Sequence, residues 1–246
     1  MNTVIFYEEL SMNAFPAPKT HFYDGWVLRF ANGIDNRSNS VNPIYTSVLP
    51  IPEKVEACEY IYARHSLPTV FKLTDESPAG LDEYLEARGY EIATPTYLFT
   101  SSILPSAREE GSVRVLKSIG QTWRKSLFRL KGLTDAGKIN TADAMMNLIQ
   151  SDAMSASIAI EGKAVACGLC VIERGYAGIY EIVVDEEYRR HGYGHKLCGA
   201  LLAEASANGA KHAYLQVEAA NGPAMALYEK MGFEAQYKYW YRVKKM

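Results

Sequence analysis

The sequence predicts an α/β fold, built twice, in which helices flank a mixed and mostly antiparallel sheet. Two observations lead to this prediction: the order of elements in the second half, and the return of that order in the first half. The chain has 246 residues, enough for one large or two small domains. Hydrophobic residues make up 48% and charged residues 22%, as is usual for a globular protein with a real core.

In the second half, alternating apolar residues and turn residues mark each element. Two strands joined by the turn Glu161-Gly162-Lys163 are followed by a third strand, a helix with leucines at helical spacing, a fourth strand, a short helix and a closing strand. Their expected ranges are 154–160, 164–173, 177–185, 194–208, 212–218, 223–231 and 236–244. Strands and helices in this order favour a mixed sheet.

The first half repeats this order, with expected elements at 25–31, 38–44, 51–65, 69–73, 79–88 and 96–101. Gly89-Tyr90-Glu91 matches Gly232-Phe233-Glu234 at an offset of 143, and the same offset without a gap places Phe71 on Tyr214. We therefore expect a tandem duplication joined near 105–111, with one domain at 1–108 and a second at 109–246.

Composition narrows the class of protein. The net charge of −2 argues against a nucleic-acid-binding protein, and no apolar run is long enough to span a membrane. The start of the chain does not resemble a signal peptide, so we expect a cytoplasmic protein. Four cysteines are too few for a disulfide scaffold, and we read Cys167-x-x-Cys170 as strand packing rather than as a zinc or redox site. No metal site is expected.

The segment Arg189-Arg190-His191-Gly192-Tyr193-Gly194 lies between an expected strand and an expected helix. Glycines in such a turn allow close approach to backbone N–H groups, and the helix adds the positive end of its dipole. The basic side chains add charge. The segment thus predicts a cradle for a pyrophosphate, although it has neither a Walker motif nor the full dinucleotide-binding pattern.

Arg189-x-x-Gly192-x-Gly194 after Ile182-Val183-Val184 resembles the acetyl-CoA signature of the GNAT superfamily of N-acetyltransferases. Downstream, Asn221-x-x-Ala224-x-x-Leu227-Tyr228-x-x-x-Gly232-Phe233 is similar to the second recurrent segment of that superfamily. The resemblance covers 112–246 strongly and 20–105 weakly, and the first half is similar to a two-copy subgroup. Glu186 departs from the family pattern, which often has proline there.

The resemblance implies a role for each matching residue. The backbone of Ile182 and Val184 would pair with the pantetheine arm of acetyl-CoA, and Asn221 would hydrogen-bond that arm. Tyr228 would protonate the leaving thiolate. The pyrophosphate would be held by the amides of a run of six residues, Arg190, His191, Gly192, Tyr193, Gly194 and His195.

An amine attacks a thioester only when it is neutral, so the reaction also needs a base. Glu181, a carboxylate in the apolar run IYEIVV, is our first candidate for the base or for an anchor of the acceptor's ammonium. Glu218 and water are the alternatives, and Glu181 could instead form an edge or inter-copy salt bridge. A backbone N–H near Val183, where this strand would splay from its neighbour, could stabilise the oxyanion. Tyr228 could also simply pack in the core.

Two regions remain open to more than one interpretation. The basic segment 114–131 is either a solvated helix face or a wall of the acceptor site. In the first copy, Thr46–Ile51 aligns with 189–194 and has no glycine, while Leu85 stands where Tyr228 does. The first copy should therefore not bind acetyl-CoA, although its Arg29, Arg37 and Asn39 could face the acceptor.

Together these observations predict an N-acetyltransferase. It would move the acetyl group of acetyl-CoA to a primary amine of a small-molecule or amino-acid-like acceptor within a ternary complex. The alternatives are a non-catalytic acetyl-CoA sensor or scaffold and an aminoacyl transferase. The sequence does not decide between a monomer and a homodimer.

Overall fold

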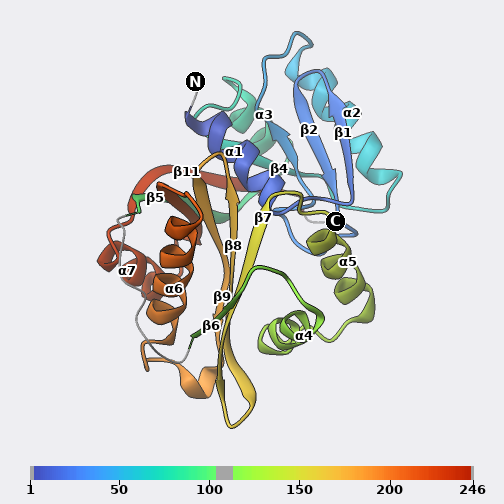
Figure 1. The fold of residues 1–246 in the computed structure, drawn as a ribbon. Helices are drawn as coiled ribbons and strands as arrows, with labels where there is room; N and C mark the ends of the chain where they lie inside the picture. Colours follow the sequence, from blue (N-terminus) through green and yellow to red (C-terminus); the bar gives the residue numbers. More distant parts are fainter. Residues whose placement is uncertain (1–2, 104–112, 245–246) are drawn as a thin grey trace. The chain divides into compact units, whose positions relative to one another are not determined.

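The computed structural model describes residues 3–103 and 113–244, so the expected join at 105–111 lies outside the described residues. The chain forms two compact units. Unit 1 contains the residues up to Tyr97, Glu218–Ala220 and the segment from Tyr237 onward. Unit 2 contains Leu98–Val217 and Asn221–Gln236. Both units combine helices with hydrogen-bonded strands, which confirms the α/β expectation (Figure 1).

Unit 1 has the strand order β1-β2-β3-β4-β11. The β3–β4 pair is parallel, and the other pairs are antiparallel. Helices α2 and α3 bury Tyr62, Leu81 and Leu85 against Trp26 and Phe71 of the strands. The elements are α1 (Thr3–Ala14), β1 (Lys19–Tyr23), β2 (Trp26–Phe30), β3 (Val41–Pro43), α2 (Ile51–Ala63), β4 (Val70–Thr74), α3 (Leu81–Ala87) and most of β11 (Glu234–Val243).

Unit 2 has the strand order β5-β10-β9-β8-β7-β6, in which β10 and β9 are parallel while β9, β8, β7 and β6 are antiparallel. Helices α6 and α4 both pack on β8 and β9, and they lie on opposite faces of these strands (Figure 1). The elements are the end of β5 (Glu91–Ser102), β6 (Val113–Leu116), α4 (Gln121–Leu130), α5 (Ala136–Asn147), β7 (Asp152–Ile160), β8 (Lys163–Glu173), β9 (Tyr176–Val184), the 3₁₀ turn η1 (Glu186–Tyr188), α6 (Tyr193–Ala207), β10 (His212–Glu218) and α7 (Gly222–Lys230).

Tight turns of the X-Gly type fix the hairpins. Asp24-Gly25, Glu161-Gly162 and Arg174-Gly175 each place two consecutive residues at positive φ, between 40° and 79°. This geometry matches the twist of paired strands and favours glycine at the second position. The expected turn at Glu161-Gly162 is therefore confirmed, and the other two turns set the registers of β1–β2 and β8–β9.

The compact units do not follow the order of the sequence. The last strand of the chain, β11, belongs mainly to unit 1, where Tyr239 lies opposite Thr74 and Val243 opposite Val70 of β4. The end of β5 belongs to unit 2, next to β10. The expected boundary between 108 and 109 therefore stays a prediction about the repeated sequence. Each compact unit contains a strand segment from the other half of the chain: β11 in unit 1 and the end of β5 in unit 2.

Strand registers correct the ungapped alignment of the two halves. Leu28 pairs with Val41 and Val41 with Phe71; correspondingly, Val171 pairs with Gly178, and Tyr214 also pairs with Gly178. Leu28 and Val171 differ by 143 in number, as do Phe71 and Tyr214, but Val41 and Gly178 differ by 137. Two compensating six-residue gaps follow: the first half has six more residues between β2 and β3, and the second half has six more between β9 and α6. The offset of 143 fails at β3 and returns near the start of α2, so the match of Thr46–Ile51 with 189–194 stays a prediction.

Four elements escaped the sequence analysis: α1, β1, β6 and α5. Helix α5 buries little more than Thr141 and Met145, so its apolar periodicity is weak. The start of α5 nevertheless carries a sequence signal, an aspartate at the N-cap. The Asp135 carboxylate accepts a hydrogen bond from the Lys138 N–H at 2.8 Å.

Candidate functional site

The C-terminal half of β9 contains a bulge centred on Glu181. The β8–β9 register shifts between Cys167 and Leu169, and Glu181 adopts a φ of 52°. Opposite the bulge, a Cβ atom at Gly168 would lie 2.7 Å from Ile182 Cδ1, so glycine gives the Ile182 side chain room to pack there. A bulge re-aims the side chain that it carries, and such bulges are common beside active sites.

The pairing of β9 with its other neighbour, β10, ends two residues before the bulge. The parallel pairing of β9 with β10 runs from Tyr176 opposite His212 to Ile179 opposite Leu215. Both strands continue, β9 to Val184 and β10 to Glu218, with no further pairs between them in the described part of the chain. Ile182 and Val184 therefore lie on a stretch of β9 that follows the end of its described pairing with β10.

The connection from β9 to α6 then forms a loop with two left-handed residues. The Asp185 carboxylate accepts a hydrogen bond from the Glu187 N–H and starts η1, after which Arg190 has a φ of 62° and Gly192 a φ of 76°. Gly192 is the N-cap of α6 and supplies no capping side chain. Because the first N–H groups of a helix have no partner within the helix, those of Tyr193, Gly194 and His195 lie at an end without a side-chain cap.

The side chains of this loop are largely exposed. Arg189 forms an ion pair with Glu186 at 3.1 Å, and His191 Nδ1 contacts the Arg189 carbonyl oxygen at 2.8 Å. The His191 ring stacks on Tyr193, while Arg190 and His195 are exposed. This geometry and charge suit an anion with several negative oxygens, because N–H groups and a helix dipole combine with nearby arginines.

Helix α7 places Tyr228 beside the start of α6. A Cβ atom at Gly194 would lie 3.3 Å from Leu227 Cδ2, so glycine lets the two helices approach. Tyr228 is 8% exposed, packs edge-on against Phe233 and lies near Cys198 of α6. Burial raises the pKa of the Tyr228 phenol above its ordinary value, and the Cys198 thiol raises it further. The phenol is thus protonated, and available as a donor, throughout the physiological pH range.

Asn221 has a structural role at the start of α7. Its Oδ1 accepts a hydrogen bond from the Ala224 N–H at 3.2 Å and caps the helix. Glu218, the second candidate for the base, is an exposed residue at the end of β10 and belongs to unit 1 by its contacts. Glu181 belongs to unit 2, as do Tyr228 and the loop.

Two basic residues at the end of α4 reach β9 on either side of Ile182–Val184. Lys131 Nζ lies 2.7 Å from Glu181 Oε2, and Arg129 pairs with Asp185 at 3.6 Å. Arg129 also donates a hydrogen bond to the Ala164 carbonyl oxygen. The salt bridge weighed for Glu181 exists, but its partner comes from α4 of the same unit. Both residues lie in the basic segment 114–131. The sequence left open whether that segment is a solvated helix face or a wall of the acceptor site.

In unit 1, the polar residues that we considered for the acceptor hold the fold together. Arg29 is buried and donates to the carbonyl oxygens of Arg37 and Phe15. Asn39 Oδ1 accepts hydrogen bonds from the N–H groups of Ala31 and Gly33. Through these contacts, the side chains of Arg29 and Asn39 hold the loop before β3 in place.

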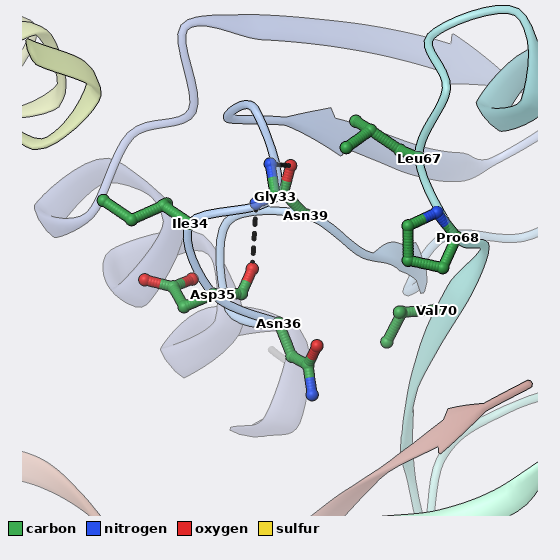
Figure 2. Close-up of a pocket in the computed structure, with 8 residues that line it drawn as sticks. All are labelled: Gly33, Ile34, Asp35, Asn36, Asn39, Leu67, Pro68 and Val70. Atoms are coloured by element: carbon green, nitrogen blue, oxygen red, sulfur yellow. Dashed lines mark hydrogen bonds between the residues drawn. The ribbon is translucent and has the colours of Figure 1, made fainter. Parts of the chain in front are cut away.

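This loop borders a cavity of about 310 Å³ (Figure 2). The Asp35 carboxylate, which lies at the cavity, accepts hydrogen bonds from Ser38 at 2.7 Å and so closes the loop on itself. None of the lining residues that the structure describes is Lys or Arg, so the cavity lacks the positive charge of the β9–α6 loop. Its lining consists of Gly33, Ile34, Asp35, Asn36, Asn39, Leu67, Pro68 and Val70.

The cysteines are all free and buried. Burial raises the pKa of Cys167 and that of Cys198 to about 12, which keeps both thiols protonated. Within 3–103 and 113–244, no group of three or more His, Cys, Asp or Glu side chains is arranged to hold a metal ion. Over the same residues, none of the helices has the length and hydropathy that a membrane crossing needs.

Comparison with known proteins agrees with this fold. The "Uncharacterized N-acetyltransferase YobR" of Bacillus subtilis is 28% identical over 97% of both chains. A GCN5-related N-acetyltransferase from Kribbella flavida superposes with a TM-score of 0.74 at 15% identity, covering 100% of this chain and 97% of that one. A tandem GNAT protein from the clavulanic acid biosynthesis pathway has a TM-score of 0.63 at 12% identity, covering 97% and 88%.

The fold and the matches define an N-acetyltransferase of the GNAT class. Within this class, a family model described as "Probable histone acetyltransferase Rv0428c C-terminal" matches residues 6–242, and the chain belongs to that family.

Proposed function

We propose that the enzyme transfers the acetyl group of acetyl-CoA directly to a primary amine of a small-molecule or amino-acid-like acceptor. The observation that carries this proposal is the departure of β9 from β10 after Ile179, followed at once by a basic loop and the uncapped start of α6. An extended cofactor arm can pair with a free strand edge, and its pyrophosphate can lie at the end of a helix.

The residues of the site fit this cofactor in kind and in order. The backbone of Ile182 and Val184 would pair with the pantetheine arm. The N–H groups of the segment 190–195 would bind the pyrophosphate, with Arg189 and Arg190 adding charge. Gly192 supports this role because it adopts the left-handed conformation of the N-cap and has no side chain to cap the helix or block a ligand.

When bound, acetyl-CoA supplies a thioester carbonyl that is activated toward amines. Glu181 takes a proton from the acceptor's ammonium and so produces the neutral nucleophile. A backbone N–H near Val183 donates a hydrogen bond to the carbonyl oxygen as the C–N bond forms. Tyr228 gives its proton to the sulfur as the C–S bond breaks. The nitrogen loses its second proton to solvent, Glu181 releases the proton that it took, and Tyr228 regains one from solvent.

The test is an assay of thiol release from acetyl-CoA with a panel of primary amines. We expect release that requires an amine, and a Glu181→Gln variant with wild-type affinity for acetyl-CoA but a kcat lower by about 10²-fold. Tight binding of acetyl-CoA without release across the whole panel would instead favour the sensor or scaffold. Absence of acetyl-CoA binding would favour aminoacyl transfer.

A further inference from the structure

The ion pair between Lys131 and Glu181 has an unusual position for a structural salt bridge. Lys131 is the C-cap residue of α4, and its Nζ lies 2.7 Å from Glu181 Oε2. The Lys131 side chain is 46% exposed, whereas that of Glu181 is 9% exposed. One partner is therefore anchored in the bulge of β9, while the other lies at the surface on a flexible four-carbon stem.

The backbone at Glu181 is held in a costly conformation. A non-glycine residue at a φ of 52° costs on the order of 1–2 kcal/mol, and a surface ion pair with a flexible lysine returns about 1 kcal/mol or less. Turn residues such as Asp24 and Arg174 share a positive φ, but at Glu181 it lies inside strand β9 at a bulge, a kind of position that is common beside active sites. Here the bulge in the β8–β9 pairing holds the residue in this conformation, and the Glu181 side chain is 9% exposed.

Charge balance then limits which acceptor can enter. If Glu181 binds the acceptor's ammonium, as in the proposed function, Lys131 loses its counter-ion. The neighbouring Arg129 is already paired with Asp185 and bonded to the Ala164 carbonyl oxygen. A simple monoamine would leave one positive charge unpaired at the site. An acceptor that carries a carboxylate next to its amine would pair with both Glu181 and Lys131.

We infer that Lys131 and Glu181 form a two-part acceptor site that selects a free α-amino acid, with Glu181 binding the ammonium and Lys131 the carboxylate. In the free enzyme the two side chains form an ion pair with each other. When the zwitterion binds, its ammonium pairs with Glu181 and its carboxylate pairs with Lys131. Lys131 is thereby a specificity residue that touches the acceptor. This inference rests on the proposed function and names its substrate class.

The test compares free amino acids with their amides, such as alanine with alaninamide and phenylalanine with phenylalaninamide. The amide keeps the amine and the side chain but loses the negative charge, as the N-terminus of a polypeptide does. We expect kcat/KM for the free acid to exceed that for the amide by at least about tenfold, the ratio that one compensated charge pair worth about 1.4 kcal/mol produces.

Variants of Lys131 assign the preference. Lys131→Met should reduce the acid-to-amide ratio by about tenfold, Lys131→Arg should retain most of it, and Lys131→Glu should favour the amide. Comparing ratios between enzymes cancels the different basicity of the two amines. Unchanged affinity for acetyl-CoA confirms that each variant is folded.

The outcomes separate this inference from the proposed function. Thiol release with amides as fast as with free acids, or a ratio that Lys131→Met leaves unchanged, would overturn the inference alone. A faster reaction with amides than with acids in the wild-type enzyme would point to a polypeptide N-terminus instead. No release with any amine would overturn the proposed function and this inference with it.

Discussion

Two connections occupy equivalent positions, the one from β3 to α2 in unit 1 and the one from β9 to α6 in unit 2. Each leads from a strand into a helix, but they differ in the negative charge that their N–H groups contact. In unit 1, the Asp24 carboxylate accepts hydrogen bonds from the N–H groups of Val48 and Leu49 and pairs with buried Lys54 at 3.1 Å. Unit 1 therefore provides its own anion for this connection. Unit 2 has six more residues here. Both α2 and α6 begin without a side-chain cap, but among the described residues no carboxylate accepts a hydrogen bond from an N–H group of 190–195.

The same contrast appears in how the units use charge. Unit 1 buries several of its charges in internal contacts, such as Lys72 with Glu8 and Arg242 with the partly exposed Asp82. Unit 2 keeps Arg189, Arg190 and Lys131 at the surface around the end of β9. Charges that are buried and paired hold a structure together, whereas charges that solvent can reach are available to a ligand. Variants in each unit test this division.

The largest effect is expected from Lys72→Met in unit 1. Glu8 is 1% exposed and would lose its ammonium partner while keeping the hydrogen bond from the Tyr237 hydroxyl. We expect the free energy of unfolding, measured in urea, to fall by about 3–5 kcal/mol. The double variant Glu8→Gln/Lys72→Met should recover much of this loss, and kcat should stay at the wild-type value in both. A large fall in kcat of the folded enzyme would contradict the assignment of structural charges to unit 1 and ligand-binding charges to unit 2.

Next is a pair of matched substitutions, Tyr228→Phe in unit 2 and Tyr62→Phe in unit 1. Tyr228→Phe removes the proposed acid but keeps the ring contact with Phe233, so we expect kcat to fall by about 10²-fold with little change in acetyl-CoA affinity. The Tyr62 hydroxyl donates to the Arg29 carbonyl oxygen at 2.9 Å. Its removal should cost about 1 kcal/mol of stability and leave kcat unchanged. Steady-state thiol release would exclude Tyr228 from the mechanism if its variant kept the wild-type rate.

A smaller effect is expected from Gly192→Ala in the loop of unit 2. A Cβ atom at a φ of 76° costs about 1–2 kcal/mol, so the loop populates its binding conformation less and affinity for acetyl-CoA should fall about tenfold. Gly199→Ala, in the interior of α6, is the control and should bind normally. Calorimetry on the wild type should find one acetyl-CoA per chain; two would mean that the connection of unit 1 also binds the cofactor.

The smallest effect concerns pH and the Asp24 carboxylate. The backbone N–H of Leu49 lowers the pKa of Asp24, with Val48 and Lys54 acting in the same direction against burial. A lowered pKa means that this contribution to stability is present above the ordinary pKa near 4 and is lost as pH falls through the lower folded value. Asp24→Asn should therefore be less stable than wild type at pH 7, and the difference should shrink toward pH 3. A difference that is constant with pH in denaturation curves would exclude this linkage.

The sequence located the elements with strong periodicity and clear boundaries. The expected strand 212–218 and the helix near 194–208 match β10 and α6 closely, because buried leucines and terminal glycines mark them. The repeat offset of 143 also holds for β2 with β8 and for β4 with β10. It failed at β3, where only hydrogen-bonded registers reveal the gap. The sequence also did not reveal that β11 belongs mainly to unit 1 and the end of β5 to unit 2, because the residues of a strand do not specify which strand it pairs with.

The sequence by itself determined the α/β class, the position of the β9–α6 loop and the candidates Glu181 and Tyr228. The class, the loop and Glu181 depend on local patterns of turn residues, charge and spacing, whereas Tyr228 follows from the resemblance of its segment to the GNAT superfamily. Only the tertiary structure decided which residues meet: Lys131 with Glu181, Gly168 with Ile182, and Asp24 with the N–H groups of its own connection. Such contacts join residues far apart in the chain, and packing and strand register set them.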